Sequence, residues 1–195
     1  MPSSAVIALV SYMLINSFTP GPGNILTLTT MTNYGWKKGS KLFRGIICGY
    51  YVVQAICAVA IYALSVYLEP ALNVIKYIGA AYLIWLAVHI ARSKPDDTGK
   101  AKEPKFLTGF LLQFVNVKIY FYGMTCLAGF VQPYYSSFLA LFLMEMIIAT
   151  VGSIASLTWA GLGISIQKIY KKYYRIINII LALFLIYCAV MMVIG

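Results

Sequence analysis

Long apolar runs, separated by short polar or basic segments, dominate the chain. Several runs exceed the ~20 residues that a helix needs to cross a bilayer. The pattern predicts six such segments, at about 5–33, 43–68, 71–91, 106–131, 136–164 and 176–194. Together they fill residues 1–195 and leave no room for a separate soluble unit. We therefore predict an all-α integral membrane protein with one transmembrane domain and six transmembrane helices.

Composition supports lipid as the solvent of this chain. Hydrophobic residues make up 62% of the sequence and charged residues only 10%. Ordinary globular domains have roughly 45–50% apolar and about 25% charged residues. The apolar excess is larger than a buried core requires.

Basic residues lie in every second connection between the predicted helices. They are Lys37, Lys38, Lys41 and Arg44, then Arg92, Lys94, Lys100, Lys102 and Lys105, then Lys168, Lys171, Lys172 and Arg175. The alternate connections, around Glu69 and at GFVQPYYSSF, carry none. This asymmetry predicts that the three basic connections are cytoplasmic and that both termini are outside, in the periplasm. Because the charges segregate by topology, the net charge of +10 does not indicate nucleic-acid binding.

The predicted topology divides into two halves of opposite orientation. Helices one to three form a repeat at about 1–92, a cytoplasmic loop follows at about 92–105, and helices four to six form a second repeat at about 106–195. Inverted three-helix repeats are typical of secondary transporters, which bind substrate where corresponding helices are broken near the midplane.

Both first helices of the proposed repeats contain such an interruption. The segment SFTPGPGN, residues 17–24, breaks the first run, and Asn116-Val117-Lys118 interrupts the fourth. Each interruption lies ~16 Å from the basic end of its helix, near the middle of a ~30 Å hydrocarbon core. The alternative interpretation is a proline kink that packs against neighbouring helices.

The proline-glycine segment also has a chemical consequence. Prolines lack an N–H, so the carbonyls of Asn16 and Phe18 lose their helical partners. A helix restarting near Gly23 and Asn24 presents N–H groups and partial positive charge, which suit a carboxylate. The candidate substrate contacts are Pro20, Gly21, Pro22, Gly23, Asn24, Thr27, Asn116 and Lys118.

Two ionisable residues lie deep in apolar segments. Lys118 is ~20 Å from the cytoplasmic edge and Glu145 is ~18 Å deep. A charge at that depth costs at least ~2.5–3.5 kcal/mol unless it finds a partner or a wet cavity. Burial favours the neutral form of a carboxyl group. Both residues are therefore candidates for proton coupling, although a purely structural ion pair between them is also open.

The remaining chemistry of the chain is sparse. Four cysteines without CxxC spacing and one histidine predict no metal, no cofactor and no catalytic residues. Gly45 and Gly49 form a GxxxG pattern, which allows close approach of a helix from the same chain or from another copy. A homo-oligomer is thus an open possibility.

The chain resembles the LysE/RhtB family of bacterial amino-acid exporters over nearly its whole length. The resemblance rests on TPGPGNILTLTTMTNYGWKKGSKLFRGIICG and on FLTGFLLQFVNVKIYFYGMT. Val117 departs from the family's Asn-Pro-Lys pattern, and Gly23 stands where the family often has asparagine. GAAYLIWLAVHIARSKP and NIILALFLIYCAV are similar to the branch that exports cysteine and O-acetylserine.

The resemblance implies an inner-membrane exporter of small neutral amino acids such as cysteine and O-acetylserine, working by proton exchange. An exporter of homoserine, threonine or lysine type is the first alternative. A membrane assembly partner that transports nothing is the second. A membrane enzyme lacks the catalytic residues that it would need.

Overall fold

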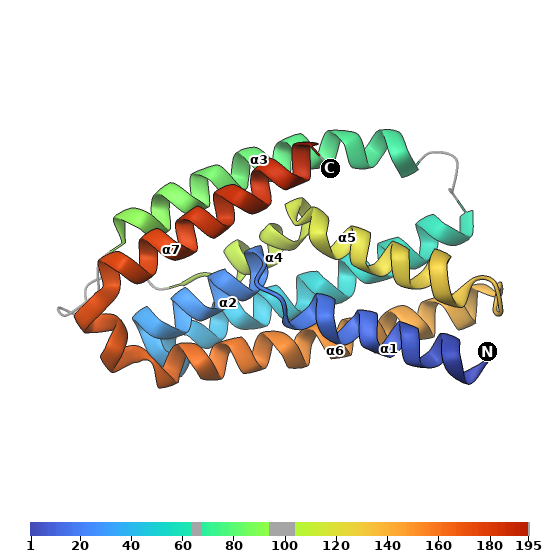
Figure 1. The fold of residues 1–195 in the computed structure, drawn as a ribbon, viewed down its shortest axis with the longest axis horizontal. Coiled ribbons are helices and arrows are strands. Elements are labelled where there is room, and N and C mark those ends of the chain that lie inside the picture. The colour runs from blue at the N-terminus through green and yellow to red at the C-terminus, as the bar shows by residue number, and fades with distance from the viewer. Residues whose placement is uncertain (64–67, 94–103, 195) are drawn as a thin grey trace.

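A computed structural model describes residues 1–63, 68–93 and 104–194 (Figure 1). Every regular element in these ranges is helical. They are α1 (Ser3–Phe18), α2 (Pro22–Ala63), α3 (Leu68–Arg92), α4 (Phe106–Val115), α5 (Val117–Met124), the π-helix η2 (Thr125–Val131), α6 (Phe138–Ser165) and α7 (Gln167–Ile194). The all-α class is confirmed. Most of the predicted loop at about 92–105 lies outside the described residues.

Three helices are long and apolar enough to cross a membrane, namely α2, α6 and Gln167–Met191 of α7. A fourth candidate combines α4 with Val117–Val131, which meet at a bend of 58°. Ser3–Phe18 and Tyr77–Arg92 are shorter apolar helices. Length and composition thus support three or four spans, and the six-span arrangement stays a prediction.

Helix α2 contains parts of two predicted segments, joined at Gly35. This glycine has φ 65° and ψ −179°, a backbone conformation that L side chains rarely adopt. The basic segment that follows is helical rather than a loop. Gly35 therefore folds the chain back with almost no intervening coil.

Helix α2 is the centre of the molecule, with α4 on one side and α6 on the other. Helices α3 and α7 form a separate pair, seen along the top of Figure 1. Gly45 and Gly49 lie so close to the backbone of α4 that a Cβ at either would collide with the carbonyls of Phe106 or Phe110. The GxxxG pattern is therefore used within the chain.

The described connections gather at two ends of the helical bundle. At one end, Gln167 Nε2 donates to the Met31 carbonyl at 2.8 Å and Asn178 Nδ2 donates to the Ser93 carbonyl at 2.9 Å. At the other, the N-terminal ammonium of Met1 donates to the Tyr135 hydroxyl at 3.3 Å. The basic segments near Gly35 and at the start of α7 thus lie at the first end, on the left of Figure 1.

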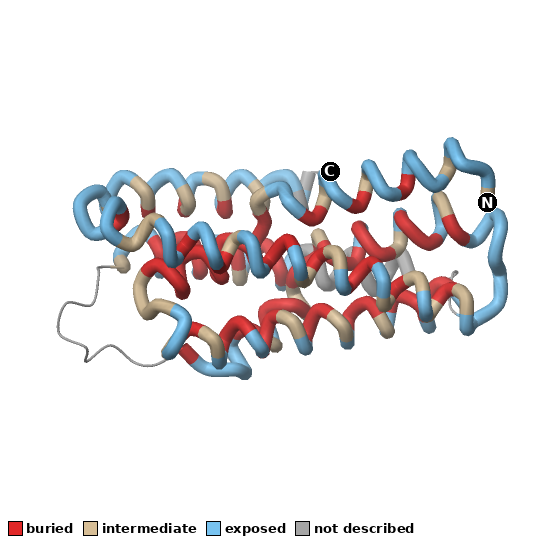
Figure 2. Tube along the Cα trace, turned by 90° about the horizontal axis from the view of Figure 1, so that it is seen from below, coloured by how far each residue is buried: buried red, intermediate tan, exposed pale blue. Residues whose placement is uncertain are grey.

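Large apolar side chains cover the outside of the bundle. Figure 2 shows exposed positions along the outer faces of the helices and buried positions where helices meet. Ile7, Ile15, Leu139 and Leu183 are each more than 60% exposed. A surface of this kind suits lipid and would aggregate in water.

Candidate functional site

The first helix break lies between Phe18 and Pro22. Thr19 leaves the helix with φ −63° and ψ 146°, the extended conformation favoured before a proline. Helix α2 begins at Pro22, and its first turn closes with Ile25 N–H donating to the Gly21 carbonyl at 2.8 Å. The restart near Gly23 predicted from sequence therefore comes earlier, because proline is well suited to the first helical position.

Each carbonyl that the break removes from the helix finds another donor. The Thr19 hydroxyl donates to the Asn16 carbonyl at 2.8 Å, and Trp159 Nε1 donates to the Phe18 carbonyl at 3.3 Å. Asn24 Nδ2 donates to the Ser17 and Thr19 carbonyls at 3.0 and 3.1 Å. The broken backbone is therefore held by side chains, as buried polar groups require.

Lys118 supplies the last of these donors from the second break. Its Nζ lies 3.1 Å from the Thr19 carbonyl, 2.9 Å from the Thr19 hydroxyl and 3.4 Å from the Pro20 carbonyl. Three acceptors match the three N–H groups of an ammonium. Lys118 thus joins the two breaks directly, and no carboxylate contacts it among the described hydrogen bonds.

The second break occurs at Asn116, although Val117 replaces the proline of the family pattern. Asn116 has φ −87° and ψ 83°, and its N–H donates to the Gln113 carbonyl at 3.3 Å. The Asn116 side-chain amide donates to Gln113 Oε1 at 3.4 Å, and its own Oδ1 is buried without a hydrogen-bond partner in the described structure. A non-helical asparagine therefore interrupts this segment without proline.

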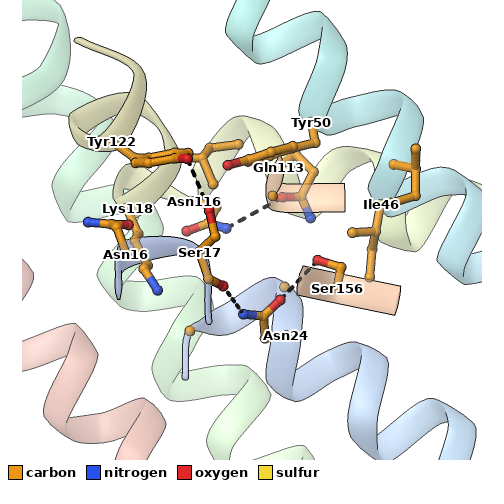
Figure 3. A pocket seen from close by; sticks show the side chains of 15 residues that line it. Asn16, Ser17, Asn24, Ile46, Tyr50, Gln113, Asn116, Lys118, Tyr122 and Ser156 are labelled. Atoms are coloured by element: carbon orange, nitrogen blue, oxygen red, sulfur yellow. Dashed lines mark hydrogen bonds between the residues drawn. The ribbon is translucent and has the colours of Figure 1, made fainter. Parts of the chain in front are cut away.

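A central cavity lies between the two breaks (Figure 3). The empty space in it, together with open solvent at its mouth, is about 440 Å³. Its polar lining consists of Asn16, Ser17, Asn24, Tyr50, Gln113, Asn116, Lys118, Tyr122 and Ser156. Only Lys118 among the lining residues carries a full charge, and none is acidic.

Hydrogen bonds connect several lining residues around Asn24 (Figure 3). Asn24 Oδ1 accepts from the Ser156 hydroxyl at 2.9 Å, while its Nδ2 donates to the Ser17 carbonyl. The Ser17 hydroxyl donates to the Tyr122 hydroxyl at 3.0 Å. This network ties α2, α5 and α6 to the first break.

The structure brings most of the predicted contact residues together. Gly21, Gly23, Asn24, Asn116 and Lys118 all line the cavity. Pro20 contributes its carbonyl to Lys118, and Pro22 lines a neighbouring groove with Val117 and Lys118.

Thr27 and Glu145 lie outside this cavity. Thr27 is fully buried on α2, and its hydroxyl has no partner among the described residues. Glu145 is fully buried on α6. Ala149, Gly152 and Ser156, which follow it at helical spacing, are buried as well.

Sequence reasoning did not identify Ser17, Gln113, Tyr50 or Tyr122 as cavity residues. Gln113 had a usable signal, since an amide three residues before Asn116 shares its helix face. The tyrosines had none, because sixteen tyrosines make any one of them unremarkable.

The described residues contain no group of three or more metal-ligating side chains. The four cysteines are free. Nothing in the lining of the cavity therefore suggests a metal or cofactor, and the polar groups suit a small polar solute.

Comparisons with known proteins agree with this interpretation. The model of the LysE type translocator family matches residues 14–195. The chain is 38% identical over 191 residues to the cysteine/O-acetylserine efflux protein of Escherichia coli O139:H28. The aligned residues cover 97% of this chain and 98% of that protein. Identity to the protein of the same description in Escherichia coli K12 is 37% with the same coverage. No solved structure matches the chain.

The family match, together with the apolar helices, identifies a multi-pass helical transport protein of the bacterial inner membrane rather than an enzyme. The chain belongs to the LysE family of translocators.

Proposed function

We propose that this translocator exports small neutral amino acids, such as cysteine and O-acetylserine, from the cytoplasm. The observation that carries the proposal is the central cavity, where two broken helices present backbone carbonyls, amides and one ammonium group. The relatives described as cysteine/O-acetylserine efflux proteins support the substrate class.

The cavity lining favours a small zwitterion. The Lys118 ammonium suits the substrate's carboxylate, and the unpartnered Asn116 Oδ1 offers an acceptor to its ammonium group. A lysine-type substrate would add a second positive charge, and no acidic residue lines the cavity to compensate it. The lining therefore favours neutral side chains such as those of cysteine, O-acetylserine, homoserine or threonine.

Lys118 acts in this proposal by exchanging partners. In the present conformation, its three donors are used by Thr19 and Pro20. An entering carboxylate competes for the same ammonium, because charge-assisted hydrogen bonds to a carboxylate are stronger than those to neutral carbonyls. Substrate binding then releases the carbonyls of the first break and loosens its attachment to the second.

Pairing of the helices supports two inverted repeats at about 1–92 and 106–195. Contacts between the two broken helices run antiparallel, from Met1 with Tyr135 to Ser17 with Tyr122 and Thr19 with Lys118. The second part of α2 packs against α6 through Tyr50 and Tyr51, and α3 packs against α7. Each predicted helix thus contacts its counterpart, an arrangement that suits two repeats related by a pseudo-two-fold axis in the membrane plane. We infer six spans with both termini periplasmic.

Export against a gradient needs an energy source, and we propose exchange with protons. We assign the binding of the exchanged proton to Lys118 and Glu145, two ionisable side chains of the bundle interior. Alternating access between the two sides then requires only that proton and substrate occupancy favour different conformations.

Inverted membrane vesicles test the proposed function directly. Vesicles containing the protein should accumulate radiolabelled cysteine or O-acetylserine above control vesicles, with homoserine, threonine and lysine as comparison substrates. We expect lysine to give the weakest signal. Absence of accumulation for the whole panel, with the protein inserted at normal abundance, would remove the exporter assignment and favour an assembly role.

A further inference from the structure

Glu145 is a fully buried carboxyl group that the substrate cavity does not use. It lies about two turns from the start of α6, with 0% of its surface exposed. Neither of its oxygens has a hydrogen-bond partner among the described residues. A buried ionised carboxylate requires a cation or several donors, and this one has neither.

The groups around Glu145 are uncharged at neutral pH. Titratable neighbours come from α2, α5 and η2, and they are Tyr50, Cys57, Tyr122 and Cys126. Helix α1, which also packs against α6, contains no acidic or basic side chain. Lys118 points instead to the carbonyls of Thr19 and Pro20. None of these groups therefore supplies a positive charge to an ionised Glu145.

Gln54 and Glu145 converge on Gly123 of α5. A Cβ placed on Gly123 would lie 2.5 Å from Gln54 Oε1 and 2.9 Å from Glu145 Oε1. The Gln54 side chain is also fully buried, and its amide has no partner in the described structure. The Gln54 oxygen and a carboxyl oxygen thus face the same point, and a protonated carboxyl group adds a donor that two bare oxygens lack.

We propose that Glu145, with Gln54 beside it, is a proton-binding site that is occupied in this conformation and emptied in another conformation of the export cycle. The coupling to export rests on the proposed function; the protonation itself does not. The site takes a proton alone, since even a methyl group on Gly123 would collide with Gln54 and Glu145.

Two tyrosines connect this proton site to the substrate cavity. Tyr50 and Tyr122 both line the cavity and both lie next to Glu145. Tyr122 is bonded to Ser17 at the first break, and Tyr50 packs directly on Gly152, where no Cβ would fit. A change in the cavity that moves either ring therefore alters the cover of the carboxyl group.

The π-helix η2 gives this region a second way to move. It begins at Thr125, two residues after Gly123, and it carries Cys126 against Glu145. π-helical turns are rare and occur mostly at functional sites. Conversion of η2 to an α-helix would change the direction in which the residues after Thr125 face, and would so alter the packing of Cys126 near the carboxyl group. Proton release then accompanies the conformational change by linkage.

Infrared difference spectroscopy tests proton binding without substrate. The purified full-length protein in lipid, labelled with ¹³C-glutamate, is compared at mildly acidic and mildly alkaline pH. We expect a protonated-carboxyl band that carries the isotope shift, titrates with pH and is lost in Glu145→Gln. A wild-type protein without such a band would overturn the proposal even if export is normal.

Proteoliposome transport tests the coupling. Glu145→Gln mimics the protonated form, so we expect substrate counterflow near the wild-type rate and at least a roughly tenfold loss of accumulation driven by a pH gradient. Glu145→Asp should restore part of the gradient-driven accumulation. Ser153→Ala, which removes a hydroxyl elsewhere on α6, serves as the matched control and should behave as wild type.

Two outcomes contradict the coupling. Gradient-driven accumulation by Glu145→Gln equal to wild type would show that the carboxyl group carries no coupled proton. Loss of counterflow together with accumulation, in a variant that unfolds at the wild-type temperature, would assign Glu145 to substrate binding instead. If the wild-type protein transports no amino acid, the proposed function fails while the spectroscopic test of the proton site still stands.

Discussion

A single lysine side chain holds the two helix breaks together. Its depth in the fourth apolar segment was predictable, because counting residues from the basic end of the helix is enough. Its partners were not predictable. Three acceptors from Thr19 and Pro20 converge on Nζ only after two segments a hundred residues apart have packed together. Sequence reasoning therefore identified Lys118 but missed its role toward the broken backbone.

The first prediction concerns Lys118. Lys118→Met keeps the length of the side chain but removes the ammonium, so the Pro20 carbonyl loses its donor and the substrate loses its positive partner. Charge-assisted hydrogen bonds contribute about 1.5–3 kcal/mol each, so we expect substrate affinity in counterflow to fall at least tenfold. Lys118→Arg should also transport poorly, because a planar guanidinium does not replace a compact ammonium between these acceptors.

Lys37→Met is the matched control, because it removes an exposed lysine at the basic end of the molecule. It should transport as wild type. Normal export by Lys118→Met, at wild-type abundance in the membrane, would show that the lysine serves packing alone.

The two helix breaks differ in how well the sequence pattern predicts them. The first break followed from two prolines and two glycines, whose effect on a helix is local. The second lacks proline, and its bend of 58° lies at Asn116, whose side-chain amide donates to Gln113 Oε1. The π-helix after Met124 has no sequence signal. Within it, Cys126 is buried and Thr125 is exposed.

The second prediction tests the first break. Pro20→Ala combined with Pro22→Ala restores two N–H groups and favours a continuous helix through the segment. A continuous helix withdraws the Thr19 and Pro20 carbonyls from Lys118 and closes the cavity at this point. We expect export to be lost while membrane insertion, measured by protease protection, is preserved. Unchanged export would reduce the segment to a packing kink.

The third prediction tests the crossing of α2 and α4, which positions Gln113 and the second break. Gly45→Ala places a methyl group against the Phe106 carbonyl, so the helices must separate. Overpacking of this kind costs typically about 1–3 kcal/mol. We expect a lower unfolding temperature in detergent and reduced transport.

Gly161→Ala is its control, since a Cβ at Gly161 meets nothing within 4 Å. That variant should be neutral or slightly stabilising, because alanine is the better helix former. Equal unfolding temperatures for the two variants would contradict the close crossing.

The bulk properties of the sequence predicted the class of the whole molecule, but the bounds of its spans could be predicted only in part. Composition and the spacing of basic residues indicated a helical membrane protein with segregated charge. The connection at Gly35 is an exception, since a sharp kink at this one residue, rather than a loop, joins the two parts of α2. Apolar runs indicate how much chain prefers lipid, but the exact helix ends depend on local turns and on neighbouring helices.

The last prediction concerns the orientation of the whole molecule. Lys37→Cys and Ser136→Cys, made singly in a background without Cys48, Cys57, Cys126 and Cys188, place one thiol at each end of the bundle. Position 37 follows Gly35 at the end where α7 begins, and position 136 follows Tyr135, which contacts the N-terminus.

The basic end should remain in the cytoplasm, because Lys and Arg translocate poorly. An impermeant thiol reagent added to intact spheroplasts should therefore label position 136 and reach position 37 only after permeabilisation. Labelling of both positions from outside would contradict the transmembrane arrangement of the bundle. Labelling of position 37 alone would show that the bundle has the opposite orientation in the membrane, with the cavity of the proposed exporter facing the opposite side.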